Sequence, residues 1–125
     1  MKQIIATTNA PAAIGAYSQA VKIGNMLFAS GQLGINPATG ELPATFAEQA
    51  EQSLKNVQAI LAEAGLDFSN VVKATVFMAN MSDFAALNEV YGRYFVKPYP
   101  ARSAVAVKEL PKGALVEIEV IAAAE

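Results

Sequence analysis

Residues 45–79 read TFAEQAEQSLKNVQAILAEAGLDFSNVVKATVFMA and contain two patterns from which the fold can be predicted. Its first part has the spacing of an amphipathic helix, with one apolar and one polar face. The apolar positions are Phe46, Ala50, Leu54, Val57, Leu61 and Ala64. Thr45 and Glu48 form a capping box at the start of this pattern, and Gly65 is a natural stop behind it. The second part, 71–79, is rich in β-branched residues and predicts a strand that follows the helix.

Shorter patterns on both sides complete the order of elements. Further strands are predicted over 2–6, 18–23, 26–30, 103–108 and 115–122. Gly24-Asn25 is a hairpin turn between two of them, and 31–43 is a loop rich in Gly, Pro, Asn and Thr. A second helix is predicted over about 83–95, capped by Ser82 or Asp83. The order β-β-β-α-β-α-β-β predicts an α+β fold, a single mixed β-sheet with two helices packed on one face.

Composition limits the chemistry that this chain can perform. The 125 residues form one expected domain, 1–125, of which 54% is hydrophobic and 16% charged. The chain has no Cys and no His, which excludes thiolate nucleophiles, the Ser-His-Asp triad and most zinc sites. A site must therefore be built from carboxylates, Arg, Lys, Tyr, Ser, Asn and backbone groups.

Charge and hydropathy limit its partners. The net charge of −2 and a pI of about 5.1 do not suit a nucleic-acid-binding surface. No apolar run reaches the ~18–20 residues that a membrane span needs, and the N-terminus lacks the apolar core of a signal peptide. We therefore expect a cytoplasmic protein that binds neither nucleic acid nor membrane.

The apolar excess must be buried somewhere. Because strands alternate sides, two helices on one face leave a second face that is too apolar for a wet surface. That second face is expected to carry Val71, Phe77, Leu115, Ile121 and several Ala. We predict a closed homo-oligomer that buries it. The alternative is a monomer with an unusually apolar surface.

Carboxylates on the same second face are the first candidates for chemistry. Glu117 and Glu119 alternate with apolar residues in the last strand, where burial needs either a cationic partner or a raised pKa. Arg102, stiffened by Pro100, is the obvious partner, and its planar fork also suits a carboxylate ligand. A plain Arg–Glu ion pair and a functional site both remain open from these residues.

Three further features are weaker candidates on their own. Ser30-Gly31 follows a strand, where glycine permits close approach of a ligand, although a simple turn explains the pair equally well. Tyr17 and Asn88 are residue types that are also common in cores and helix caps.

Several sequence blocks together resemble one known family. They are 9–19 (NAPAAIGAYSQ), 30–32 (SGQ), 36–40 (NPATG), 72–77 (VKATVF), 88–91 (NEVY), 100–103 (PARS) and 116–119 (VEIE). In this order and over essentially the whole chain, they resemble the reactive intermediate deaminase A family, also called the YjgF/YER057c/UK114 family.

The resemblance implies a chorismate-mutase-like fold and a homotrimer with sites between subunits. It implies a cofactor-independent and metal-independent hydrolase, a 2-iminobutanoate/2-iminopropanoate deaminase that serves metabolite damage control. The substrates are small 2-imino acids or their enamine tautomers, formed when pyridoxal-phosphate enzymes eliminate water from serine or threonine. Hydrolysis gives the 2-keto acid and ammonia.

The resemblance also assigns roles to residues. Arg102 matches the arginine that binds the substrate carboxylate, and Glu117 matches the glutamate that activates water. The matched pocket positions are Tyr17, Ser30, Gly31, Asn88 and Ala104. The family often has Cys at the last of these, so only a backbone contact is expected from Ala104.

Two other functions remain as alternatives. The first is a non-catalytic module that binds small carboxylates on the same trimeric fold and for which Glu117 is dispensable. The second is an RNA-cleaving translation inhibitor, which the acidic pI and the absence of His disfavour.

Overall fold

Helix α1, Phe46–Glu63, has the predicted ends in a computed structural model that describes residues 1–125. The hydroxyl of Thr45 accepts a hydrogen bond from the Glu48 N–H at 3.2 Å, and the Glu48 carboxylate accepts one from the Thr45 N–H at 3.3 Å. Behind the helix, Gly65 has φ +76°, a left-handed conformation that favours glycine. The capping box and the glycine stop are therefore both confirmed.

The buried face of α1 also carries polar residues that the apolar pattern did not predict. They are Gln49, Ser53 and Asn56. The Ser53 hydroxyl donates to the Gln32 carbonyl at 2.7 Å, and the Asn56 amide donates to the carbonyls of Leu33 and Ile35 at 3.0 and 2.9 Å. Because buried polar groups need such partners, α1 holds segment 32–35 in place.

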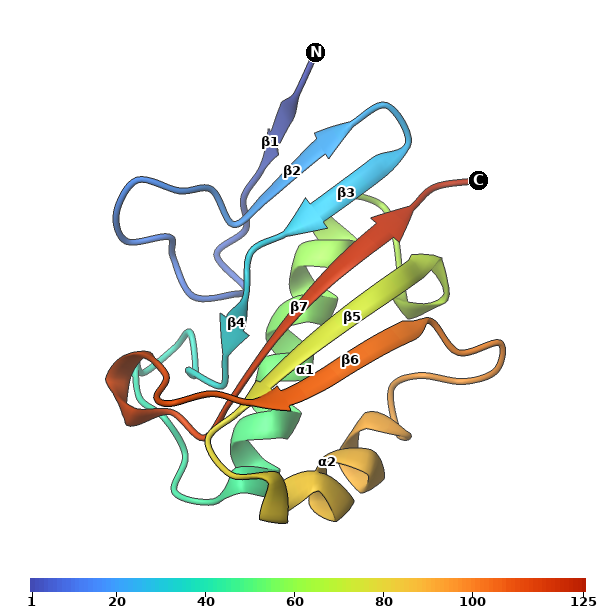
Figure 1. The fold of residues 1–125 in the computed structure, drawn as a ribbon. Helices are drawn as coiled ribbons and strands as arrows, with labels where there is room; N and C mark the ends of the chain where they lie inside the picture. The colour runs from blue at the N-terminus through green and yellow to red at the C-terminus, as the bar shows by residue number, and fades with distance from the viewer.

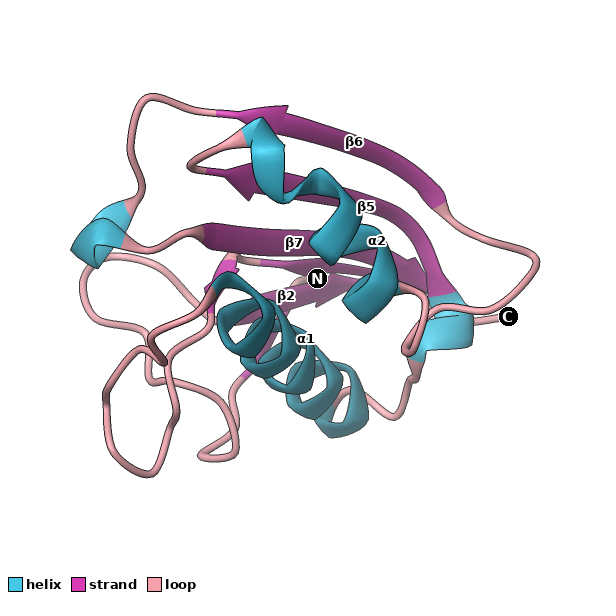
Figure 2. Cartoon of the chain, turned by 90° about the horizontal axis from the view of Figure 1, so that it is seen from below, coloured by secondary structure: helices cyan, strands magenta, loops and turns pink.

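One seven-stranded sheet covers α1 and α2 from the same side (Figure 1). The strands are β1 (Gln3–Ile5), β2 (Ala20–Ile23), β3 (Met26–Ala29), β4 (Gln32–Leu33), β5 (Val71–Met78), β6 (Ala101–Ala106) and β7 (Val116–Ala123). Their order is β1-β2-β3-β7-β5-β6, and β4 also pairs with β7. Only β5 and β6 run parallel, connected through α2 (Phe84–Tyr91). Figure 2 shows both helices on one side of the strands, which confirms the predicted α+β fold.

Three elements differ most from the prediction. The predicted loop 31–43 contains the two-residue strand β4, which is too short to leave a pattern in the sequence. Strand β6 begins and ends two residues before the predicted 103–108, so Arg102 lies inside it. Helix α2 stops before Gly92 rather than at residue 95, and neither Ser82 nor Asp83 caps it through its side chain. A 3₁₀ turn precedes α2 instead and connects it to β5.

A β-bulge near the start of β5 reverses the predicted sides of two residues. Val71 pairs with Ala122 and Lys73 pairs with Ile121, so Val72 is an extra residue. Val71 consequently lies in the core, and Val72 is 47% exposed on the open face. From Ala74 onward the alternation follows the prediction.

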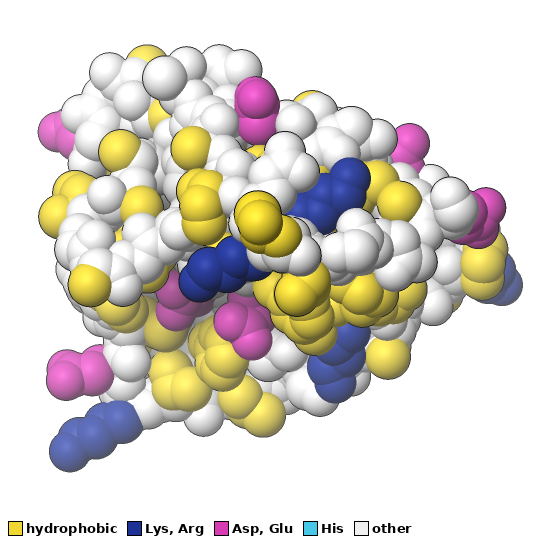
Figure 3. Space-filling model, turned by 90° about the horizontal axis from the view of Figure 1, so that it is seen from above, with side chains coloured by type: hydrophobic (Ala, Val, Ile, Leu, Met, Phe, Trp, Pro, Cys, Tyr) yellow, Lys and Arg dark blue, Asp and Glu magenta, His cyan; other side chains and the backbone are white.

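The core lies between the helices and one face of the sheet, while the other face stays open and apolar. Leu27, Val76, Met78 and Ile118 are fully buried on the helix side. On the open face Phe28, Val72 and Val105 are 44–47% exposed, and Phe77 and Ile121 are half-buried. Leu115 instead packs against the core, which corrects its predicted place. In Figure 3 the hydrophobic side chains gather in patches that a few charged side chains interrupt. Neither helix combines the length and apolar character needed to span a membrane.

Candidate functional site

Glu117 lies on the open face of β7, close to the backbone of Gly31. Its neighbours Val116 and Ile118 are fully buried on the helix side, so strand alternation places the carboxylate on the other side. A Cβ atom built on Gly31 would lie only 2.5 Å from Glu117 Oε2. The N–H of Gly31 donates to no group in the chain. Glycine at position 31 therefore allows a carboxylate and a free backbone donor to lie side by side.

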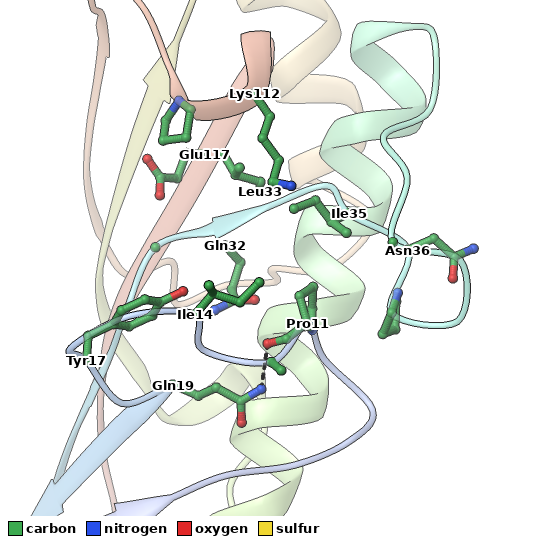
Figure 4. A pocket seen from close by; sticks show the side chains of 15 residues that line it. Pro11, Ile14, Tyr17, Gln19, Gln32, Leu33, Ile35, Asn36, Lys112 and Glu117 are labelled. Atoms are coloured by element: carbon green, nitrogen blue, oxygen red, sulfur yellow. Dashed lines mark hydrogen bonds between the residues drawn. The ribbon is translucent and has the colours of Figure 1, made fainter.

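A cavity of about 570 Å³ opens beside this pair (Figure 4). Tyr17, Glu117 and Lys112 reach its rim from three different segments, and Leu33 and Ile35 supply an apolar wall. This volume lies within the range of ligand sites in proteins.

The loop that carries Tyr17 is pinned by a buried glutamine. The amide of Gln19 donates to the carbonyls of Thr7 and Pro11 at 3.1 and 2.7 Å, and its oxygen accepts from the N–H of Thr7 at 2.7 Å (Figure 4 shows the bond to Pro11). Gln19 was not predicted as a site residue, because a polar residue beside a strand carries no signal of burial. Gln19 holds the loop so that Tyr17 faces the cavity.

The pKa of the Glu117 carboxyl lies above its usual value. Burial beside the cavity is the larger cause, because it disfavours the charged form, and the neighbouring charge of Glu119 adds to it. Of the two alternatives for a carboxylate on an apolar face, this chain has the raised pKa rather than a cationic partner. Such a carboxyl group can take up and return a proton closer to neutral pH than an ordinary glutamate can.

Arg102 lies on the opposite side of the sheet from Glu117, which corrects the predicted pairing of the two. In register, Arg102 pairs with Ala74, whose side chain is buried against the helices, whereas Glu117 pairs with Phe77 on the open face. The only ion pair in the chain joins Arg93 to Glu51, so Arg102 has no carboxylate partner. Ala74 and Phe77 are three positions apart in β5, so they and the residues paired with them point to opposite faces of the sheet. The side chains of Arg102 and Glu117 therefore cannot meet within one chain.

Helix α2 holds the guanidinium of Arg102. Its Nη1 donates to Asn88 Oδ1 at 2.9 Å, and its Cζ lies 4.8 Å from the ring centroid of Tyr91 and 5.4 Å from that of Phe84. A second hollow, of about 360 Å³, lies here between α2 and the residues before β6. Asn88, proposed from the sequence as a pocket residue, therefore contacts Arg102 and lies apart from the Glu117 cavity.

Backbone donors line the free edge beside Arg102. The Val107 N–H bonds to the Met78 carbonyl of β5 at 2.9 Å, so alternate N–H groups along β6 face β5. Those of Arg102 and Ala104 face the other way, and β6 is the last strand of the sheet. The Ala104 methyl packs against the core, and its N–H faces the free edge of the sheet.

The predicted site residues thus fall into two groups and one exception. Tyr17, Gly31 and Glu117 surround the large cavity, and Arg102, Asn88 and Ala104 gather at the β6 edge. Ser30 belongs to neither group, since its hydroxyl donates to the Ser18 carbonyl at 2.7 Å and its side chain lines neither hollow. The chain gathers no group of three or more side chains suited to holding a metal ion.

Comparisons with known proteins agree over nearly the whole chain. Residues 7–124 match the family model described as Endoribonuclease L-PSP. A 2-iminobutanoate/2-iminopropanoate deaminase of Capra hircus is 54% identical over 98% of this chain and 90% of its own length. The deaminase of the same name from Escherichia coli K12 is 52% identical over 98% of both chains. The crystal structure of RidA from a Psychrobacter species superposes with a TM-score of 0.95 at 52% identity, covering 98% of this chain and 99% of that one.

Proposed function

The chain belongs to the endoribonuclease L-PSP family, and from that membership we propose that it is a 2-iminobutanoate/2-iminopropanoate deaminase. It hydrolyses small 2-imino acids to 2-keto acids and ammonia. The observation that carries this conclusion is the identity of 52–54% to relatives of that name over 98% of the chain. A fixed arginine and a carboxyl group of raised pKa supply the groups that such a reaction needs.

Arg102 binds the carboxylate of the substrate in this proposal. One N–H group of Arg102 donates to Asn88 Oδ1, and the other donors of the planar guanidinium can form a bidentate pair with a carboxylate. The outward N–H of Ala104 adds a neutral donor on the same edge. Fixing the carboxylate at one end of a small substrate also fixes the direction of its C=N bond.

Glu117 acts on the water molecule. The oxygen of water bonds to the imine carbon while its proton passes to the Glu117 carboxylate, which leaves a carbinolamine. Glu117 then returns that proton to the nitrogen, and the C–N bond breaks. The hydroxyl gives its proton to the Glu117 carboxylate as the keto group forms, and this proton leaves with ammonia as ammonium. A protonated imine is already electrophilic, so positioning and proton transfer suffice. The free N–H of Gly31 can donate to the oxygen of that water and help to hold it beside Glu117.

The two groups of site residues must come from two chains. Arg102 and Glu117 lie on opposite faces of one sheet, while the open face carries apolar side chains that remain exposed in a single chain. We propose a cyclic homotrimer in which the β6 edge of one chain meets the Glu117 cavity of the next. Burial of the open face supplies the driving force for association.

Two variants and one control test the assigned roles. Arg102→Ala should abolish the release of ammonia from 2-iminopropanoate generated in solution, and Glu117→Ala should lower kcat by about 10²–10⁴-fold. The matched control is Arg93→Ala, because this exposed arginine pairs only with Glu51 and lies outside both groups. Normal turnover by Arg102→Ala would contradict the assignment.

A non-catalytic carboxylate-binding protein is the second candidate, because the Arg102 site is complete without Glu117. It predicts that wild-type protein binds a 2-keto acid without deaminating any imine, and that Glu117→Ala binds it equally well. The family name also points to RNA cleavage, which the net charge of −2 and the absence of His disfavour. A nuclease signal that disappears on further purification would exclude that activity. The cytoplasmic location stays a prediction.

A further inference from the structure

Helix α2 presents three residues to one guanidinium. Phe84, Asn88 and Tyr91 are spaced i, i+4 and i+7, so they lie on a single helix face, and all three contact Arg102. The amide supplies a hydrogen bond that fixes the plane of the guanidinium. The two rings supply apolar surfaces with a negative face, on which a flat cation rests without losing its N–H donors to other groups.

Tyr91 is the rigid member of this set. Only 6% of it is exposed, and its ring stacks on Phe95 with centroids 4.2 Å apart and an interplanar angle of 22°. Phe95 is itself 2% exposed and contacts the Phe68 ring edge-on, with centroids 4.9 Å apart. The surface under Arg102 is therefore anchored in the core of the protein.

The hydroxyl of Tyr91 is distinct from its ring. It is buried and has no hydrogen-bond partner in the chain, the one side-chain polar atom in that state. A buried hydroxyl without a partner lowers the stability of the fold. It also forms no hydrogen bond with Arg102, so only the ring of Tyr91 contacts the guanidinium. Ring and hydroxyl can be tested separately, because phenylalanine keeps the first and removes the second.

We propose that Tyr91 is a positioning residue of the carboxylate site, whose ring holds the Arg102 guanidinium flat and ready for bidentate binding. This inference rests on the proposed function, since it takes Arg102 to be the group that binds the substrate carboxylate. The ring acts on affinity for the carboxylate, which all 2-imino and 2-keto acids share, and leaves the hydrolytic step to Glu117.

The first test is steady-state kinetics with 2-iminopropanoate. Tyr91→Leu should raise KM by roughly 5- to 30-fold, the range that corresponds to one cation–π contact, and should leave kcat little changed. Tyr91→Phe should keep the KM of the wild type and unfold at the same or a higher temperature. A Tyr91→Phe variant as weak as Tyr91→Leu would overturn the inference, because the hydroxyl would then be the functional group. An unchanged KM in Tyr91→Leu would overturn it equally.

A second test separates positioning from general packing. Phe95→Leu removes the ring that packs under Tyr91 and does not contact Arg102, so it should lower the unfolding temperature and raise KM by clearly less than Tyr91→Leu does. Binding of 2-oxopropanoate should weaken in Tyr91→Leu by the same factor as KM rises. In an Arg102→Ala background, the Tyr91→Leu change should no longer alter the dissociation constant. An equal loss of affinity with and without Arg102 would contradict the inference.

This binding measurement also keeps the two proposals apart. If wild-type protein binds 2-oxopropanoate but releases no ammonia from imines, the proposed function fails and the role of Tyr91 can still be read from binding. If wild-type protein is active and Tyr91→Leu binds normally, only the inference about Tyr91 fails.

Discussion

Mixing two inactive variants should restore activity, because the proposed site takes Arg102 from one chain and Glu117 from the next. The two side chains lie on opposite faces of the same sheet, so neither variant can complete its own site. Arg102→Ala chains still carry an intact cavity, and Glu117→Ala chains still carry an intact β6 edge. A site is complete only where an intact edge meets an intact cavity.

The size of the rescue follows from counting these junctions. In an equal random mixture, about half of the edges and about half of the cavities are intact, so about a quarter of the junctions are complete. Ammonia release should therefore recover to about 25% of the wild-type rate per chain. The chains are mixed by unfolding and refolding together, and native mass spectrometry confirms that hybrid assemblies form.

A matched mixture gives the control. Wild-type chains mixed equally with Arg102→Ala/Glu117→Ala double-variant chains also leave about a quarter of the junctions complete if sites are shared between chains. If each chain held a whole site, this second mixture would keep about half of the activity and the first mixture would keep none. Hybrid assemblies without recovered activity in the first mixture would refute the shared site.

Other predictions concern the cavity and its support. Glu119→Gln removes a charge that raises the pKa of Glu117, so the acid limb of kcat/KM against pH should move to lower pH, whereas an unmoved limb would assign it to another group. Because a raised pKa means that the folded state holds the proton more tightly, charged Glu117 lowers stability as pH rises through that pKa. Glu117→Gln should thus raise the unfolding temperature at about pH 7 and not at about pH 3. Gly31→Ala should push the Glu117 carboxylate aside and lower kcat by up to about 10²-fold with little loss of stability, as activity and thermal-unfolding assays can show. Gly34→Ala should have the opposite balance of effects, because its new methyl would lie 2.7 Å from the Cα atom of Gln49 in the backbone of α1. This substitution should lower the free energy of unfolding, measured in urea, by about 1–3 kcal/mol. Asn56→Ala leaves two carbonyls of segment 32–35 without their donor and should lower the free energy of unfolding by about 1–3 kcal/mol, and an unchanged urea midpoint would show that solvent replaces that donor.

Local signals in the sequence were sufficient to predict helix α1 and the strand face that packs against the helices. The capping box at Thr45, the glycine at 65 and the alternation along β7 each depend on neighbouring residues, and the structure confirms all three. The apolar open face followed from the same alternation, because two helices can cover only one side of a sheet.

Features that depend on how the strands pair could not be predicted from neighbouring residues. An extra residue in a strand leaves no mark on composition, so the bulge at Val72 reversed two predicted positions. Arg102 was expected beside Glu117 because it was placed ahead of a strand over 103–108, whereas it lies inside β6 and the strand register turns its side chain to the other face. Ser30 was expected at a pocket, and this stays a prediction; its hydroxyl donates to the Ser18 carbonyl.

Residues that support the site were missed for a related reason. Gln19 and Asn56 are buried polar side chains whose partners lie far along the chain, and nothing local indicates their burial. Phe84 and Tyr91 did carry a signal, since they share a helix face with Asn88, a residue already considered. Helical spacing around a candidate side chain therefore predicts which residues lie on the same helix face, even when the strand that the face contacts is not known.

The initial rate of ammonia release measures directly whether this chain hydrolyses 2-imino acids. 2-Iminopropanoate is generated in solution by an amino acid oxidase, and the rate is measured with increasing amounts of the purified protein. We expect a rate that rises in proportion to wild-type protein and stays at the spontaneous value with Arg102→Ala. A rate equal to spontaneous hydrolysis at every concentration of wild-type protein would contradict it.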